Sequence, residues 1–197
     1  MLNSWVPIMP NLLELDLSFN QFKQIGHVGI WRQCYLQKLS ASKNSLDIEI
    51  INSPKNTSEC TRYALERLDL HESLYGTIPE TIGRLANLRS LDLSGSRLTG
   101  PIPESLGRLR FLEVLDLSSN QLTGPIPTFL GNLARLDLSF NQLNGSIPES
   151  IGNLSALTYL DLSVNRLMGL IPTTLGRLVS LQAVSVSSNL LIGTIPF

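Results

Sequence analysis

The sequence LDLSGSRLTGPIPESLG at residues 91–107 is followed, 24 residues after its first leucine, by LDLSSNQLTGPIPTFLG at residues 115–131. The same unit recurs along the chain at intervals of 24, 29, 23, 24, 21, 24 and 24 residues, and its copies begin at Leu15, Leu39, Leu68, Leu91, Leu115, Leu136, Leu160 and Val184. Internal repeats with a period of roughly 20–50 residues are typical of solenoids and other stacked arrays. The sequence therefore predicts a single solenoid over residues 1–197, with about eight repeats and an irregular loop near residues 47–64.

Each segment of the unit has a physical role. The triplet LDL alternates apolar and polar side chains, which predicts a short strand centred on the aspartate, with its leucines on one side. The segments L-x-G and I-P predict a turn and a fixed φ, and ESLGxL predicts a short helical turn in which Gly107 either ends the turn or permits close packing. An asparagine amide in the unit can bond backbone groups of its own and the neighbouring coil. We expect a ladder of Asn20, Asn44, Asn120, Asn141, Asn165 and Asn189, with Ser73 and Ser96 in the other two units.

The leucines of the unit explain why the copies must stack. No single coil can bury its own leucines, so neighbouring coils bury one another's. Each buried leucine contributes about 1.5–3 kcal/mol, which makes a continuous leucine column the main source of stability. A helical repeat is disfavoured, because proline and glycine interrupt every unit.

Composition and motifs exclude several classes of function. The net charge is −1 and no run of Lys or Arg exists, which argues against nucleic-acid binding. No apolar run approaches the ~18 residues of a membrane span, and residues 1–10 do not resemble a signal peptide. His27 and His71 are isolated, and Cys34 and Cys60 lack the spacing of metal ligands. We therefore expect no catalysis, no metal site and no cofactor.

The aspartate of each predicted strand admits two interpretations. Neighbouring carboxylates on a sheet, ~4.8 Å apart, suit a cation or an acid–base pair. However, nothing in the sequence pairs with them as a nucleophile or as a His or Cys ligand, and in seven of the eight units a serine that can donate to the aspartate follows the strand. Hydrogen bonding within the unit is the favoured role of this row, which comprises Asp16, Asp69, Asp92, Asp116, Asp137 and Asp161.

The other outward positions vary from unit to unit, as expected of a surface that discriminates between partners. Phe140 and Val164 occupy the same row in neighbouring units, with Tyr159 and Arg135 close by, and this composition is typical of a binding hot spot. Scattered apolar surface residues are the alternative interpretation. The predicted partner-binding residues of the concave face are Arg67, His71, Glu72, Arg89, Glu113, Arg135, Phe140, Tyr159, Val164 and Gln182.

The stretch LTGPIPESLGRLRFLEVLDLSSNQLTGPIP at residues 98–127 resembles the plant extracellular type of leucine-rich repeat, LxxLxxLDLSxNxLxGxIPxxLGxL. In addition, CTRYALERLDL at residues 60–70 is similar to plant receptor-like proteins that perceive microbial xylanase or glucanase. The resemblance implies an α/β fold, namely a curved right-handed leucine-rich repeat solenoid. Its parallel β-sheet would lie on the concave face and its short 3-10 or α turns on the convex face.

The same resemblance implies a non-catalytic recognition module in the ectodomain of a plant receptor-like protein, on the apoplastic face of the plasma membrane. Its partners would be a protein or peptide ligand, such as a microbial secreted enzyme, and a coreceptor kinase, in immune or developmental signalling. The alternative is a secreted inhibitor of microbial wall-degrading enzymes, similar to polygalacturonase inhibitors. The caps, membrane helix and kinase of such receptors have no counterpart in these residues, which predicts a fragment of a longer protein.

Two further features fit secretion. Cys34 and Cys60 lie on the outer approach to adjacent coils, where they form either a disulfide or two buried thiols. Glycosylation sequons occur at Asn56, Asn144 and Asn153, although roughly two would arise by chance at this composition.

Overall fold

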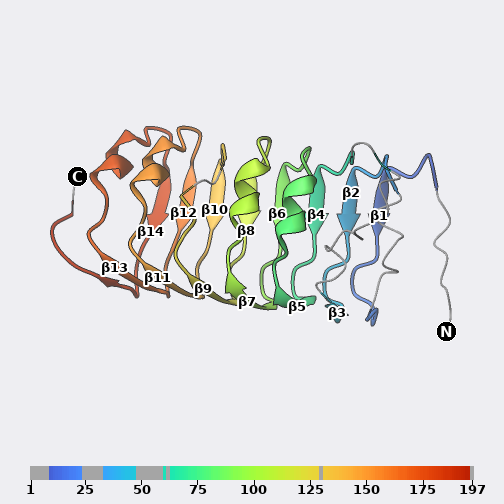
Figure 1. Ribbon diagram of the computed structural model, residues 1–197, viewed down its shortest axis with the longest axis horizontal. Coiled ribbons are helices and arrows are strands. Elements are labelled where there is room, and N and C mark those ends of the chain that lie inside the picture. Colours follow the sequence, from blue (N-terminus) through green and yellow to red (C-terminus); the bar gives the residue numbers. More distant parts are fainter. Residues whose placement is uncertain (1–8, 24–32, 48–59, 61–62, 129–130, 196–197) are drawn as a thin grey trace.

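A computed structural model describes residues 9–23, 33–47, 60, 63–128 and 131–195. The chain winds into a row of stacked coils, with a strand of one sheet on one face and short helices on the opposite face (Figure 1). This arrangement confirms the predicted leucine-rich repeat solenoid. An eight-stranded parallel sheet is formed by β1 (Glu14–Asp16), β2 (Lys38–Ser40), β4 (Arg67–Asp69), β6 (Ser90–Asp92), β8 (Val114–Asp116), β10 (Arg135–Asp137), β12 (Tyr159–Asp161) and β14 (Ala183–Ser185).

A second parallel sheet follows the first around each coil. It has seven strands, β3 (Leu46–Asp47), β5 (Leu74–Thr77), β7 (Arg97–Pro101), β9 (Gln121–Gly124), β11 (Gln142–Gly145), β13 (Arg166–Gly169) and β15 (Leu190–Leu191). Four 3-10 helices complete the described coils, η2 (Glu80–Arg84), η3 (Glu104–Arg108), η4 (Glu149–Asn153) and η5 (Thr173–Arg177). Each of them begins directly after the proline of an Ile-Pro pair, whose extended backbone ends the preceding segment.

The strands of the first sheet pair without any offset between repeats. Leu39 pairs with Leu68 across the longest step, and Leu115 pairs with Leu136 across the shortest. Differences in repeat length are therefore absorbed outside this sheet. One detail of the sequence prediction is wrong: each strand begins one residue before the leucine and ends at the aspartate, so the leucine is central. The strand starts one residue early because the residue before the leucine also pairs with its counterpart in the neighbouring strand.

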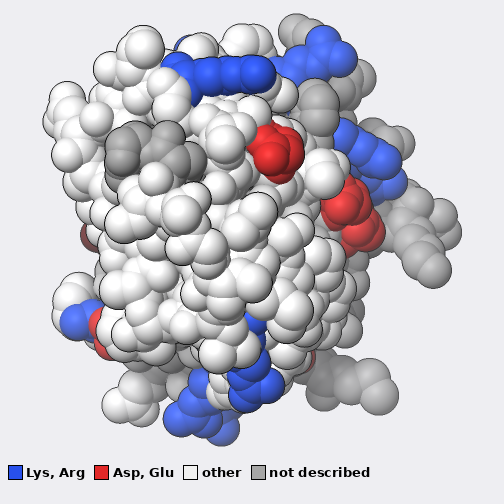
Figure 2. Space-filling model, turned by 90° about the vertical axis from the view of Figure 1, so that its left-hand side faces the viewer, with Lys and Arg blue, Asp and Glu red and all other residues white. Residues whose placement is uncertain are grey.

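The leucine column forms one continuous core. Leu91, Leu115 and Leu136 are fully buried because a coil covers each of them on both sides. The last described coil has a neighbour on one side only, and its Val184 is 43% exposed. The space-filling view of this end shows a broad uncharged surface with the charged side chains near its margin (Figure 2).

Asparagine side chains link consecutive coils just after the strands of the first sheet. The amide of Asn120 donates to the carbonyl oxygens of Leu93, Leu117 and Ser118 at 2.9–3.1 Å, and its oxygen accepts from the N–H of Leu98 at 2.9 Å. The side-chain amides of Asn44, Asn141, Asn165 and Asn189 likewise bridge to the preceding coil, whereas that of Asn20 bonds carbonyls of its own coil. These bonds pair peptide groups that lie between the two sheets and would otherwise be buried without partners.

A serine makes a smaller version of this bridge. The hydroxyl of Ser73 donates to the carbonyl of Ala41 at 2.8 Å and accepts from the N–H of Asn44 at 3.0 Å. Its shorter side chain reaches fewer backbone groups than the amide does. The backbone compensates, because the N–H of Leu46 bonds the carbonyl of Ser73 directly at 2.7 Å.

Two glycines of the LGxL segment are required by the next coil. A Cβ added at Gly83 would lie 2.7 Å from the carbonyl oxygen of Ser105, and one at Gly152 would lie 2.4 Å from that of Thr174. At these positions the glycine therefore permits close packing of successive 3-10 helices. Of the two roles open for this glycine in the sequence, packing is the one that the structure supports here.

Some sequence expectations fall outside the described residues. Most of the irregular loop near residues 47–64 lies there, as do residues 129–130 in the shortened coil. The structure describes no 3-10 helix between β9 and β10. Among the described residues, no helix has the length and apolar character needed to cross a membrane.

Candidate recognition surface

The first sheet presents three outward positions in each coil. The first is the residue before the central leucine, and in-register pairing aligns these residues into one row: Glu14, Lys38, Arg67, Ser90, Val114, Arg135, Tyr159 and Ala183. We call this the variable row. The second position is the aspartate that ends most strands, and the third lies two residues later. The variable row changes chemistry in nearly every coil, whereas the other two positions are mostly aspartate and serine, so the variable row is the part of the sheet best suited to distinguish partners.

The aspartate row bonds to its own coils. The hydroxyls of Ser94, Ser118 and Ser139 donate to the aspartate two residues earlier at 2.6–2.7 Å. Burial raises the pKa of Asp116, the Ser118 hydrogen bonds oppose this, and the charges of Asp137 and Asp92 add to it. At the first strand, hydrogen bonds from Ser18 lower the pKa of the exposed Asp16. These aspartates therefore fix the backbone of their own coil where each strand ends.

Arg135 and Tyr159 form the centre of an aromatic and cationic cluster on the variable row. The guanidinium of Arg135 lies 3.7 Å from the centroid of the Tyr159 ring and donates to Asp137 at 3.2 Å. The Tyr159 hydroxyl donates to Asp161 at 3.4 Å. Partial burial and the nearby charges of Asp137 and Asp161 raise the pKa of the tyrosine. These contacts hold both side chains in one arrangement on the sheet.

Phe140 and Val164 each follow, by three residues, the end of the strand that carries Arg135 or Tyr159. Both have left-handed backbone conformations, with φ of 53° and 54°. Their N–H groups donate to the carbonyls of Ser163 and Ser187 in the next coil at 3.0 and 2.9 Å. The two residues therefore occupy the same position in neighbouring coils, as the sequence predicted. Their side chains are 57% and 37% exposed, so a partner can reach them.

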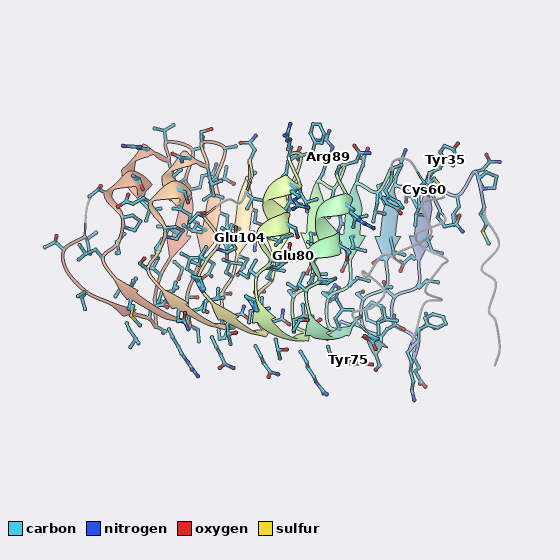
Figure 3. All side chains as sticks on the ribbon, viewed as in Figure 1. Tyr35, Cys60, Tyr75, Glu80, Arg89 and Glu104 are labelled. Atoms are coloured by element: carbon cyan, nitrogen blue, oxygen red, sulfur yellow. A yellow bond between two sulfur atoms is a disulfide. The ribbon has the colours of Figure 1, made fainter. Side chains whose placement is uncertain are left out.

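Arg89, Glu113 and Gln182 lie elsewhere than the sequence placed them. Each directly precedes a strand. They therefore lie along the edge of the sheet formed by the N-terminal ends of its strands, which we call the N-terminal rim. Arg89 lies along one long edge of the molecule, opposite the edge that carries Tyr75 (Figure 3). Its guanidinium donates to Glu113 at 2.6 Å and lies 5.7 Å from the Phe111 ring. The strands hold only three residues, so a position one residue earlier falls outside the concave sheet.

The remaining predicted residues lie toward the N-terminal half. Arg67 belongs to the variable row on β4, and Glu72 has the same left-handed conformation as Phe140. His71 is not isolated, contrary to the sequence analysis. Its Nδ1 lies 2.7 Å from Oδ1 of Asp69, and ligand atoms of His71, Asp69 and Asp92 all lie within 4.8 Å of one another. The available sequence signal was a histidine two residues after an aspartate, where most other units carry serine.

Features associated with secretion lie away from this surface. A disulfide links Cys34 and Cys60 in successive coils, with their Cα atoms 5.4 Å apart. Asn144 on β11 and Asn153 at the end of η4 are both exposed, as acceptors of a glycan must be. Asn56 lies outside the described residues.

Comparisons with known proteins agree with this architecture. Residues 52–188 match a family model described as a leucine-rich repeat region, and residues 9–26 match one described as a leucine-rich repeat. A search of curated proteins gave no match.

The structure is similar to ectodomains of plant receptors. The ectodomain of GASSHO1/SCHENGEN3 from Arabidopsis thaliana, in complex with CASPARIAN STRIP INTEGRITY FACTOR 2, is 34% identical with a TM-score of 0.82, over 95% of this chain and 22% of that one. The peptide hormone receptor RGFR1 in complex with RGF2 is 34% identical with a TM-score of 0.81, over 92% and 29%. The Arabidopsis receptor kinase HAESA, in complex with the peptide hormone IDA and the co-receptor SERK1, is 29% identical with a TM-score of 0.71, over 94% and 39%. The chain thus spans less than two-fifths of the length of each of these proteins.

Proposed function

This chain belongs to the leucine-rich repeat family, and we propose that it is a non-catalytic recognition module from the extracellular region of a plant receptor. It binds a peptide or protein along the variable row and the adjoining C-terminal rim, which carries Phe140 and Val164. The Cys34–Cys60 disulfide and the exposed sequon asparagines Asn144 and Asn153 support an oxidising, secretory location. The peptide complexes of the similar receptors support the class of ligand.

The observation that carries this proposal is the stacked pair of Arg135 and Tyr159 on two neighbouring coils that also expose Phe140 and Val164. Arginine and aromatic side chains dominate the energetics of many interfaces. The attraction between the guanidinium and the ring face also holds the two side chains together. Here the Asp137 carboxylate and the in-register strands already hold the pair in place. A preformed surface lowers the ordering cost of binding, so a short peptide can bind it without rearranging the sheet.

The test is a selection of peptides from a display library on the purified chain. We expect the selected peptides to lose roughly tenfold or more of their affinity for the double variant Phe140→Ala/Tyr159→Ala, as expected for hot-spot residues. The matched control is Tyr75→Ala, which removes a 49% exposed aromatic side chain from the second sheet. Peptides that bind the double variant as tightly as the unmodified chain would contradict the proposed surface.

A further inference from the structure

The coil that contains β4 differs from its neighbours at one position of the concave surface. In the coils of β6, β8 and β10, a serine two residues after the strand donates its hydroxyl to the last aspartate of that strand. His71 holds this position in the β4 coil and makes the equivalent contact through its ring, with Nδ1 2.7 Å from Oδ1 of Asp69. The substitution therefore keeps the local hydrogen bond and adds a metal-ligating group.

A second carboxylate lies beside this pair. Asp92 pairs in register with Asp69 across β4 and β6, and one ligand atom from each of His71, Asp69 and Asp92 lies within 4.8 Å of the other two. All three side chains are half-buried. The N–H and hydroxyl of Ser94 both bond Oδ1 of Asp92 at 3.0 and 2.6 Å, which orients that carboxylate and leaves it a second oxygen to offer an ion.

We propose that His71, Asp69 and Asp92 bind a divalent transition-metal ion of the zinc type. One imidazole nitrogen and two carboxylate oxygens are ligands that zinc accepts, whereas calcium and magnesium prefer oxygen ligands alone. A divalent charge also offsets the repulsion between two carboxylates on adjacent strands. Three protein ligands leave a four-coordinate ion one position for water or for a group of a bound partner. Zinc binding at these three residues does not require that the proposed peptide recognition is correct.

The first experiment is calorimetric titration of the full chain with zinc chloride after removal of any affinity tag. We expect one site that weakens at least about tenfold in His71→Ser and in Asp92→Asn, a loss typical even of groups outside the first coordination shell. His71→Ser is a conservative change for the fold, because serine occupies the same position in the neighbouring coils. The chain has only two histidines, so zinc should shift the imidazole NMR signals of His71 and not those of His27.

The second experiment moves the site within the solenoid. In the His71→Ser background, Ser118→His places an imidazole beside the in-register carboxylates of Asp116 and Asp137, and we expect it to restore zinc binding. The control is Ser187→His in the same background, where the strand of that coil ends in a serine instead of an aspartate. Unchanged zinc affinity in His71→Ser, equal recovery in both relocated variants, or no binding at millimolar zinc would each overturn the proposal.

Discussion

Successive 3-10 helices lie so close together that adding one methyl group, by replacing Gly152 with alanine, should lower the stability of the fold. A Cβ at Gly152 would lie 2.4 Å from the carbonyl oxygen and 2.5 Å from the Cβ of Thr174, well inside the 3.0 Å below which such contacts are essentially not found. Because the obstacle includes backbone, rotating a side chain cannot relieve it. Gly152→Ala must therefore separate two coils, and we expect it to lower the free energy of unfolding by about 1–3 kcal/mol.

Gly176 supplies the matched control. It occupies the same position in η5, but a Cβ there would meet no atom within 4 Å. Neither glycine has a left-handed backbone conformation, so alanine is conformationally acceptable at both. Replacing either glycine lowers the entropy of the unfolded chain equally, which stabilises a compatible site by about 0.4–1 kcal/mol. The difference between the two variants therefore reports the packing conflict alone.

Urea unfolding followed by far-UV circular dichroism measures this difference under identical conditions. From most to least stable, we expect Gly176→Ala, the unmodified chain, Gly83→Ala and Gly152→Ala. Gly83→Ala ranks above Gly152→Ala because its added Cβ would lie 2.7 Å from the nearest atom instead of 2.4 Å. Each kcal/mol should shift the thermal midpoint by about 2–4 °C in a chain of this size. Equal stability of Gly152→Ala and Gly176→Ala would refute the argument that the next coil requires the glycine.

Three further predictions concern stability. Asn120→Ala should lower the free energy of unfolding by at least about 1–3 kcal/mol in the same urea assay, because the buried N–H of Leu98 loses its acceptor. Asp116→Asn should raise stability at neutral pH, since a carboxyl whose folded pKa is raised costs stability when ionised. That gain should vanish in titrations below its ordinary pKa of 3.8, where the carboxyl is protonated in both states. The double variant Cys34→Ser/Cys60→Ser should lower stability by about 2–4 kcal/mol, as a thermal melt would show, and an unchanged melt would contradict a stabilising disulfide.

Most of the fold could be predicted from the repeat itself. The period required stacking, because the leucines of one coil have no other way to leave water. The asparagine and Ile-Pro segments identified the positions where backbone groups need partners or where φ must be restricted. Stacking, backbone partners and restricted φ depend only on residues of one unit and of the adjacent, nearly identical unit. The repeated sequence pattern is therefore sufficient to predict them.

The candidate sites were less predictable, because they depend on contacts between different units. The step of 23 residues between Leu68 and Leu91 leaves the pairing of β4 with β6 undetermined in the sequence. The zero offset in the structure pairs Asp69 with Asp92 and so brings Asp92 close to His71. The frame of the three-residue strands likewise decides that Arg89 lies on the N-terminal rim instead of the sheet. The sequence by itself determined that the coils stack and which side chains fill their core. The tertiary structure alone decided which variable side chains meet, because hydrogen-bond pairing between coils sets their alignment to a single residue.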